Sequence, residues 1–452
     1  MLHRRQLHPW ILLAALAVGC PADDSEPCEC DDDTGDDDVA GECEQDDECS
    51  QYEICEEGSC VDGDRNNALD EGPLLGWGEE RAGWINPAGD VDFYRLDGEQ
   101  ALFFRAQAVT LDGTEEGGLD TVLRFHSADG TELGYNDTYD RLEHLYGTDA
   151  IYLGCTPRSQ AYYLSVLDHG TRVGDPDLMS SGSDAIYTVQ VDQLDTSEVE
   201  FEPNDEIGDA TDGGISDYNV SFDRAGVISA PGDVDLWRME LEAGARLRLY
   251  AFEHTATEIN SRVRILAQDG ISEMAVYDSL DWTFQAGVPL LDEGPIFVEV
   301  GDRQGSGSDE HCYVLHLAAD PAGEVYVAET EPNDEGPTAE PLAENDSDLL
   351  AVAGRIAPVG DVDHFVFQVA NPGDGATISL QGRSLGSALA AHVSVLGPDD
   401  SELAAVDVSV SDETVVENLD LDEAGTYHVV VSATDPGDGG FDHWYGLFVE
   451  IE

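Results

Sequence analysis

The sequence predicts an all-β protein with three tandem antiparallel β-sandwiches, and three observations predict it. Apolar and polar residues alternate over short runs that end in Asp-Gly or Pro-Gly pairs, as in "TYHVVVSATDPG" from Thr426. No long window has the spacing of an amphipathic helix. The motif "GDVD" occurs three times, from Gly89, Gly232 and Gly360, and its repeat distance matches a whole domain rather than a solenoid unit.

The composition fits packed domains but is unusually acidic. The chain has 452 residues, of which 41% are hydrophobic, so several cores can form. It carries 97 acidic and 19 basic residues, a formal net charge of −78, and every basic residue is an arginine. Such a charge repels nucleic acids and anionic membrane surfaces, so we expect neither as a partner. A solubilising, salt-adapted surface accounts for most of these acids.

Residues 1–19 form a predicted signal peptide. Two arginines precede an apolar run from Trp10 to Val18, which is too short for a permanent transmembrane helix. The run leads into "LAVGC", which resembles the lipobox of bacterial lipoproteins; this implies that Cys20 is lipidated, with simple cleavage as the alternative. Pro21 stands where an aspartate would indicate retention at the inner membrane. We therefore expect a lipid-anchored protein of the cell envelope, at the outer membrane or cell surface.

Two short segments follow the signal peptide. Residues 20–42 are acidic and small, which predicts a disordered, self-repelling tether. Within residues 43–61, the cysteines have the spacing that is typical of a small disulfide-rich module, and four cysteines permit three pairings. A zinc site is the alternative, although no histidine lies nearby. The module's cysteines are Cys43, Cys49, Cys55 and Cys60.

Four further cysteines remain after the anchor and the module. Cys28 and Cys30 are too close in sequence to pair comfortably with each other, so each has its partner elsewhere or none. Cys155 and Cys312 lie in different repeats. We expect these two to be buried thiols rather than a bridge.

The rest of the chain divides into three predicted sandwiches, over residues 62–194, 199–319 and 328–452. Copies two and three contain "EFEPNDEIGDA" from Glu200 and "ETEPNDEGPTA" from Glu329, each followed by "GDVD". This motif pair resembles the bacterial pre-peptidase C-terminal domain, found beside secreted proteases and in the collagen-binding domains of bacterial collagenases. The resemblance implies a β-sandwich of jelly-roll type. Copy one is a degenerate match, with "DGDRNNALDEG" from Asp62.

The aspartates of "GDVD" are in phase with the core. Residues two apart on a strand point to the same side, so the side chains of Asp233 and Asp235 are expected on the same side as that of Trp237. An unpaired carboxylate at the rim of a core costs several kcal/mol, which calls for a cation. Arginine occurs at no matching place in all three copies. A turn cap that accepts backbone N–H groups is the alternative.

The acidic linker supplies further oxygens. The prolines of "EPND" hold the preceding acids extended, so both can share one face. Folded against the Asp-x-Asp strand, such a linker gathers about six oxygens, which suits calcium better than magnesium. Calcium-binding members of the resembled family use the equivalent acids as ligands, which implies a structural calcium ion. The implied ligands are Glu200, Glu202, Asn204, Asp205, Asp233 and Asp235 in copy two, Glu329, Glu331, Asn333, Asp334, Asp361 and Asp363 in copy three, and Asp62, Asp64, Asn66, Asp90 and Asp92 in copy one.

No catalytic motif emerges, so we expect no enzyme. The chain has no H-E-x-x-H, no G-x-S-x-G and no phosphate-binding glycine loop, and its histidines show no local ligand spacing. The prediction is a non-catalytic binding or adhesion protein that takes an extracellular protein or polysaccharide ligand. The alternatives are an accessory or spacer module of a secreted proteolytic system, and an unrecognised polysaccharide hydrolase.

Overall fold

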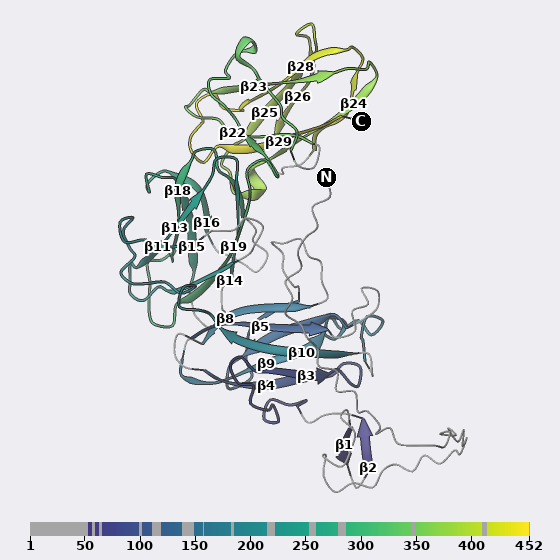
Figure 1. Cartoon of the computed structure of the whole chain (residues 1–452), viewed down its shortest axis with the longest axis vertical. Helices are drawn as coiled ribbons and strands as arrows, with labels where there is room; N and C mark the ends of the chain where they lie inside the picture. Colours follow the sequence, from purple (N-terminus) through teal and green to yellow (C-terminus); the bar gives the residue numbers. More distant parts are fainter. Residues whose placement is uncertain are drawn as a thin grey trace, which may run out of the picture.

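The computed structural model describes residues 53–56, 59–62, 66–98, 102–110, 119–137, 149–156, 158–181, 185–214, 222–252, 259–278, 286–345, 349–408 and 414–451. Strands dominate these residues, and they form three two-sheet sandwiches that follow one another along the molecule (Figure 1). The predicted all-β fold is confirmed. No helix within the described residues is long and apolar enough to span a membrane.

The first sandwich follows a short hairpin of β1 (Glu53–Glu56) and β2 (Ser59–Asp62). One sheet has the order β3 (Glu80–Trp84), β10 (Ile186–Gln193), β5 (Leu102–Thr110) and β8 (Ala150–Thr156). The other has the order β4 (Val91–Gly98), β9 (Gln160–Asp168), β6 (Thr121–His126) and β7 (Glu132–Asn136). A single-turn helix, α1 (His169–Val173), follows β9.

The second sandwich repeats this arrangement. One sheet has the order β12 (Phe222–Val227), β19 (Cys312–Asp320), β14 (Arg246–Phe252) and β17 (Ala286–Pro289). The other has the order β11 (Thr211–Asp212), β13 (Val234–Leu241), β18 (Gly294–Asp302), β15 (Ser261–Leu266) and β16 (Glu273–Asp278). The short β11 pairs in parallel with β13 and belongs to the linker that precedes the sandwich.

The third sandwich has a short linker strand on both sheets. One sheet has the order β20 (Val327–Ala328), β22 (Leu350–Arg355), β29 (Trp444–Ile451), β24 (Asp374–Gln381) and β27 (Thr414–Leu421). The other has the order β21 (Glu340–Pro341), β23 (Val362–Val369), β28 (Gly425–Ala433), β25 (Ala391–Leu396) and β26 (Glu402–Val408). Two 3-10 turns, η2 (Gly336–Thr338) and η3 (Arg383–Leu385), lie in the connections.

All three sandwiches share one topology. When the eight main strands of each are numbered along the chain, one sheet has the order 1-8-3-6 and the other 2-7-4-5. This is the order of a jelly roll, as the resemblance implied. Each sandwich encloses its own cluster of buried apolar side chains. In β23, for example, Asp363, Phe365, Phe367 and Val369 are buried while the residues between them are more exposed, which is the phase predicted from the sequence.

Sandwiches one and two are joined covalently. A disulfide links Cys155 of β8 to Cys312 of β19, with the two Cα atoms 6.6 Å apart. The expectation that these cysteines are separate thiols was wrong. Strands β8 and β19 pack against each other, and Phe103 and Val314 complete an apolar cluster around the bridge. This interdomain packing has no signature in the local sequence, so separation into different repeats misled the prediction.

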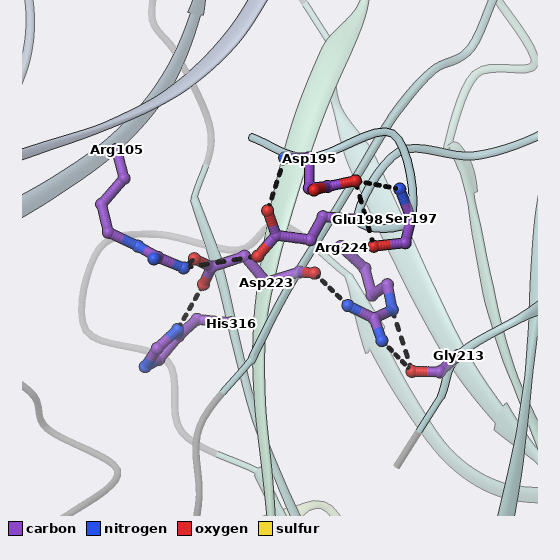
Figure 2. A network of polar contacts seen from close by, with 8 residues as sticks. All are labelled: Arg105, Asp195, Ser197, Glu198, Gly213, Asp223, Arg224 and His316. Carbon is purple, nitrogen blue, oxygen red and sulfur yellow. Dashed lines mark hydrogen bonds and ion pairs between the residues drawn. The ribbon is translucent and has the colours of Figure 1, made fainter. Parts of the chain in front are cut away.

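An ion network centred on one buried aspartate reinforces the same junction (Figure 2). Asp223 of β12 is fully buried, and it binds Arg105 of the first sandwich and His316, whose Nδ1 lies 2.6 Å from the carboxylate. Burial opposes ionisation, but the bond to His316 and the charge of Arg105 hold the pKa of Asp223 below its ordinary value. Glu198, in the linker, lies 3.6 Å from the same arginine.

Sandwiches two and three are joined by side chains that cross between them. Trp444, the first residue of β29, is buried within the apolar cluster of sandwich two. Its indole Nε1 donates to the carbonyl oxygen of Met274 at 2.9 Å. The hydroxyl of Tyr277 donates to the carbonyl oxygen of Leu385 at 2.7 Å. Both bonds anchor sandwich three against the edge strand β16.

Several sequence predictions fall outside the described residues. These are the signal peptide, the acidic tether, and the residues Cys20, Cys28, Cys30, Cys43, Cys49 and Asp64. The backbones of Cys55 and Cys60 face each other across the hairpin as register partners. The pairing of the module's cysteines therefore stays a prediction.

Candidate metal centres

The Asp-x-Asp motif and the linker meet at the same place in every copy. The backbone N–H after the second aspartate donates to the carbonyl oxygen of an upstream asparagine. The bonds run from Phe93 to Asn66 at 2.7 Å, from Leu236 to Asn204 at 3.2 Å and from His364 to Asn333 at 3.2 Å. Each linker is thereby fixed against the start of the second main strand, which aligns the three predicted ligand sets residue by residue.

In copy two the structure brings three carboxylates together. Oxygens of Glu200, Glu202 and Asp235 all lie within 4.8 Å of one another. The backbone N–H of Val227 donates to Glu200 Oε1 at 2.6 Å, and Asn204 Nδ2 lies 3.3 Å from Glu200 Oε2. These bonds hold the glutamate in the mouth of the sandwich beside the fully buried aspartate.

Two buried residues of copy two have oxygens that are not satisfied by well-formed hydrogen bonds. Within the described part of the chain, neither carboxylate oxygen of Asp235 makes a hydrogen bond of good geometry, although Glu200 and the Tyr313 hydroxyl lie close enough to shift its pKa, and Asn204 Oδ1 has no hydrogen-bond partner. Both residues are fully buried. Leaving such oxygens unpaired costs several kcal/mol, so the arrangement favours a cation as the missing partner.

Copy three has the same geometry. Oxygens of Glu329, Glu331 and Asp363 lie within 4.8 Å of one another. The backbone N–H of Arg355 donates to Glu329 Oε1 at 2.7 Å, as Val227 does to Glu200 in copy two. Among the residues described, Glu329 Oε2, Asn333 Oδ1 and Asp363 Oδ1 are buried without a hydrogen-bond partner. Both copies therefore leave the asparagine Oδ1 and an oxygen of the buried aspartate unsatisfied by the described residues. In copy three Asn333 Nδ2 and Glu329 Oε2 are also unpaired within this part of the chain, whereas the equivalent atoms of copy two lie 3.3 Å apart.

The electrostatics of both clusters disfavour bare charges. Burial, and then the adjacent Glu200, raise the pKa of Asp235 to about 11. Burial, and then the charge of Glu329, raise the pKa of Asp363 to about 10. Burial also raises the pKa of Glu329 to about 8. In the absence of a cation these groups hold protons at neutral pH, and a bound cation would replace those protons.

The first aspartate of each motif has a second role. Asp90, Asp233 and Asp361 each accept the backbone N–H of the residue four positions upstream, which closes the turn before the strand. The turn cap considered from the sequence therefore exists. In copies two and three the same aspartate also lies beside a linker aspartate. Burial, and then the adjacent Asp233, raise the pKa of Asp205, and burial, and then the adjacent Asp334, raise the pKa of Asp361.

Sequence reasoning missed a tyrosine and a glycine at each site. Tyr445 of β29 donates its hydroxyl to Asp363 Oδ2, and Gly354 faces this tyrosine across the sheet. A Cβ added at Gly354 would lie 2.3 Å from the Tyr445 hydroxyl and 2.6 Å from Glu329 Oε2. The glycine therefore makes room for both groups. Gly226 stands in the same relation to Tyr313 and Glu200. The signal was a third repeated motif, A-G-x-I, which is "AGWI" at 82–85, "AGVI" at 225–228 and "AGRI" at 353–356.

Copy one fills this position differently. Asp92 is fully buried and accepts a hydrogen bond from Tyr187, whose hydroxyl lies 2.7 Å from that of Tyr94. A Cβ at Gly83 would lie 2.6 Å from the Tyr94 hydroxyl, which therefore takes the place of the linker glutamate oxygen in the other copies. Asn66 and Asp90 are buried nearby, but only the backbone of Asp62 is described. No acidic cluster is found among the described residues of this copy.

The residues of copies two and three fit calcium. Each offers three clustered carboxylates, a buried amide oxygen and an adjacent aspartate pair. Calcium takes about six to eight oxygens in an adaptable shell, whereas magnesium prefers few protein ligands and strict octahedral geometry. An ion held there would neutralise the buried charge and tie the linker to the strand.

Comparisons with known proteins found weak structural likenesses. No family model and no curated protein matches the chain. The pre-peptidase C-terminal domain of collagenase from Bacillus anthracis is similar at 14% identity over 26% of this chain and 93% of that one, with a TM-score of 0.19. The M60 catalytic domain with two CBM51 domains of Clostridium perfringens ZmpB is similar at 11% identity over 84% and 37%, with a TM-score of 0.17. A biofilm-associated protein BSP domain is similar at 10% identity over 84% and 66%, with a TM-score of 0.14. At these scores the likenesses assign neither a family nor a function.

Proposed function

We propose that this chain is an exported, lipid-anchored, non-catalytic binding or adhesion protein of the cell envelope, and that its second and third sandwiches each hold a structural calcium ion. The observation that carries the calcium proposal is the pair of matching clusters with orphaned buried oxygens. Three jelly rolls in series would extend the protein away from its anchor. The predicted signal peptide and the lipobox-like sequence support the export and the lipid anchoring.

In this proposal calcium has a structural role. Glu200 and Glu329 belong to the linkers that precede sandwiches two and three, and Asp235 and Asp363 belong to their core-facing strands. An ion bound by both the linker and the strand would fix the linker to the sandwich that follows it. A ligand that binds the folded but not the unfolded state raises the free energy of unfolding by RT ln(1 + [L]/Kd), where [L] is the free ligand concentration. The gain is about 2.7 kcal/mol when calcium is at a hundredfold excess over its Kd.

The test is thermal unfolding of the full chain with calcium, with magnesium and with chelator, at one ionic strength. A constant ionic strength separates specific binding from general screening of the chain's negative charge. We expect calcium alone to raise the midpoint, and Asp235→Ala with Asp363→Ala to remove the rise. Glu240→Gln, on the exposed face of β13, is the matched control and should leave the rise intact. Equal effects of calcium and magnesium, or no effect of either, would overturn the proposal.

A further inference from the structure

A cleft lies where sandwiches two and three meet. Its volume is about 390 Å³. The buried side chains of Met274, Leu290 and Ile296 form its floor, and Phe441 of sandwich three forms a wall with 40% of its surface exposed. Among the described residues, Phe441 is the one lining residue from sandwich three, and the others belong to sandwich two.

The wall of the cleft is held in place by an arginine. The Arg355 guanidinium lies 4.6 Å from the centre of the Phe441 ring, and its Nη1 lies 3.1 Å from Asp292, which also lines the cleft. The backbone N–H of the same arginine donates to Glu329 Oε1 in the third-copy cluster. Arg355 therefore connects the cleft to the candidate calcium site, and neutralises Asp292.

The rim retains an open negative charge. Glu293 lines the cleft, is exposed, and makes no hydrogen bond or ion pair with any described residue. Asp269 lies on the neighbouring turn, where backbone N–H groups hold its carboxylate in place. An apolar, aromatic interior below a carboxylate rim complements a side chain with an aliphatic stem and a cationic end.

We propose that this cleft binds a lysine or arginine side chain presented by a partner peptide. The methylenes of that side chain pack on Phe441 and the apolar floor, while its cation pairs with Glu293. The chain itself has no lysine and a large excess of acid, so the complementary charge comes from the partner. This inference rests on the proposed binding role of the protein and names the chemistry of the partner.

The test is fluorescence anisotropy with full-length protein and a labelled Gly-Leu-Lys-Leu-Gly peptide at physiological ionic strength. We expect saturable binding that weakens about three- to tenfold in Glu293→Gln, and at least about tenfold in Phe441→Ala. Glu80→Gln, on the exposed surface of β3, removes the same charge far along the molecule and should change nothing. A peptide with Nε-acetyllysine should not bind.

Three results would overturn the inference: no binding, equal binding of the acetylated peptide, or equal weakening by Glu80→Gln, which would show general attraction to an acidic protein. The titration is run with calcium and with chelator. If the peptide binds but calcium does not stabilise the protein, the cleft proposal stands and the calcium proposal fails. If calcium stabilises the protein but the peptide does not bind, the calcium proposal stands and the cleft proposal fails.

Discussion

Replacing Asp235 by asparagine should have opposite effects with and without calcium. At pH 7 the metal-free aspartate holds a proton, because its pKa lies at about 11 rather than at the ordinary 3.8. Folding at pH 7 must therefore supply that proton, over about three pH units at about 1.4 kcal/mol each, or about 4 kcal/mol. Asparagine has a similar shape and needs no proton.

In chelator, Asp235→Asn should therefore raise the free energy of unfolding by about 1–4 kcal/mol, and in calcium it should lose most of the metal's stabilisation. Urea unfolding followed by tryptophan fluorescence measures both, since Trp237 lies two residues further along the strand. Glu240→Gln, on the exposed face of that strand, should change either value by no more than about 0.5 kcal/mol. If Asp235→Asn is destabilised equally in both conditions, the aspartate is an ordinary structural acceptor and not a metal ligand.

Three further predictions follow from the structure, and a fourth follows from the sequence. In chelator, the free energy of unfolding should fall as pH rises from 5 to 9. The reason is that Asp363, with its pKa raised to about 10, keeps its proton in the folded state well above the pH at which the unfolded chain releases it. Calcium should remove this fall, and chemical denaturation at several pH values measures it. Replacing Cys155 and Cys312 together by serine should lower the free energy of unfolding by about 2–5 kcal/mol, measured against wild type under oxidising conditions; no loss would mean that the bridge does not form. Tyr94→Phe should destabilise the protein by about 1–3 kcal/mol equally with calcium and with chelator, whereas a calcium-dependent loss would place a metal in copy one. Cys20→Ala should move the protein from the membrane fraction to the soluble fraction of fractionated cells, and retention in the membrane fraction would contradict lipid anchoring.

The fold was readable from the sequence because its signals are local. Strand alternation and turn residues act over a few positions, so the all-β class and the burial phase of Asp363 with Phe365 followed directly. The jelly-roll order came from the family resemblance, since strand pairing over long distances leaves little trace in one sequence. The whole-domain repeats then fixed three copies of the same order.

The candidate sites were readable only in part. The acids could be selected because they repeat at fixed spacing, and the structure gathers Glu200, Glu202 and Asp235. The tyrosine that reaches the buried aspartate comes from the far end of each copy, as Tyr313 does in copy two, so no local pattern connects them. The Cys155 bridge depends on packing between sandwiches and was equally hidden.

Calorimetric titration of calcium into the full-length, chelator-treated protein counts the metal sites themselves. We expect two calcium ions per chain, one of which is lost in Asp235→Asn and the other in Asp363→Asn, with magnesium unable to compete at equal concentration. If the chain binds no calcium, or binds it equally well after both substitutions, neither acidic cluster is a calcium site.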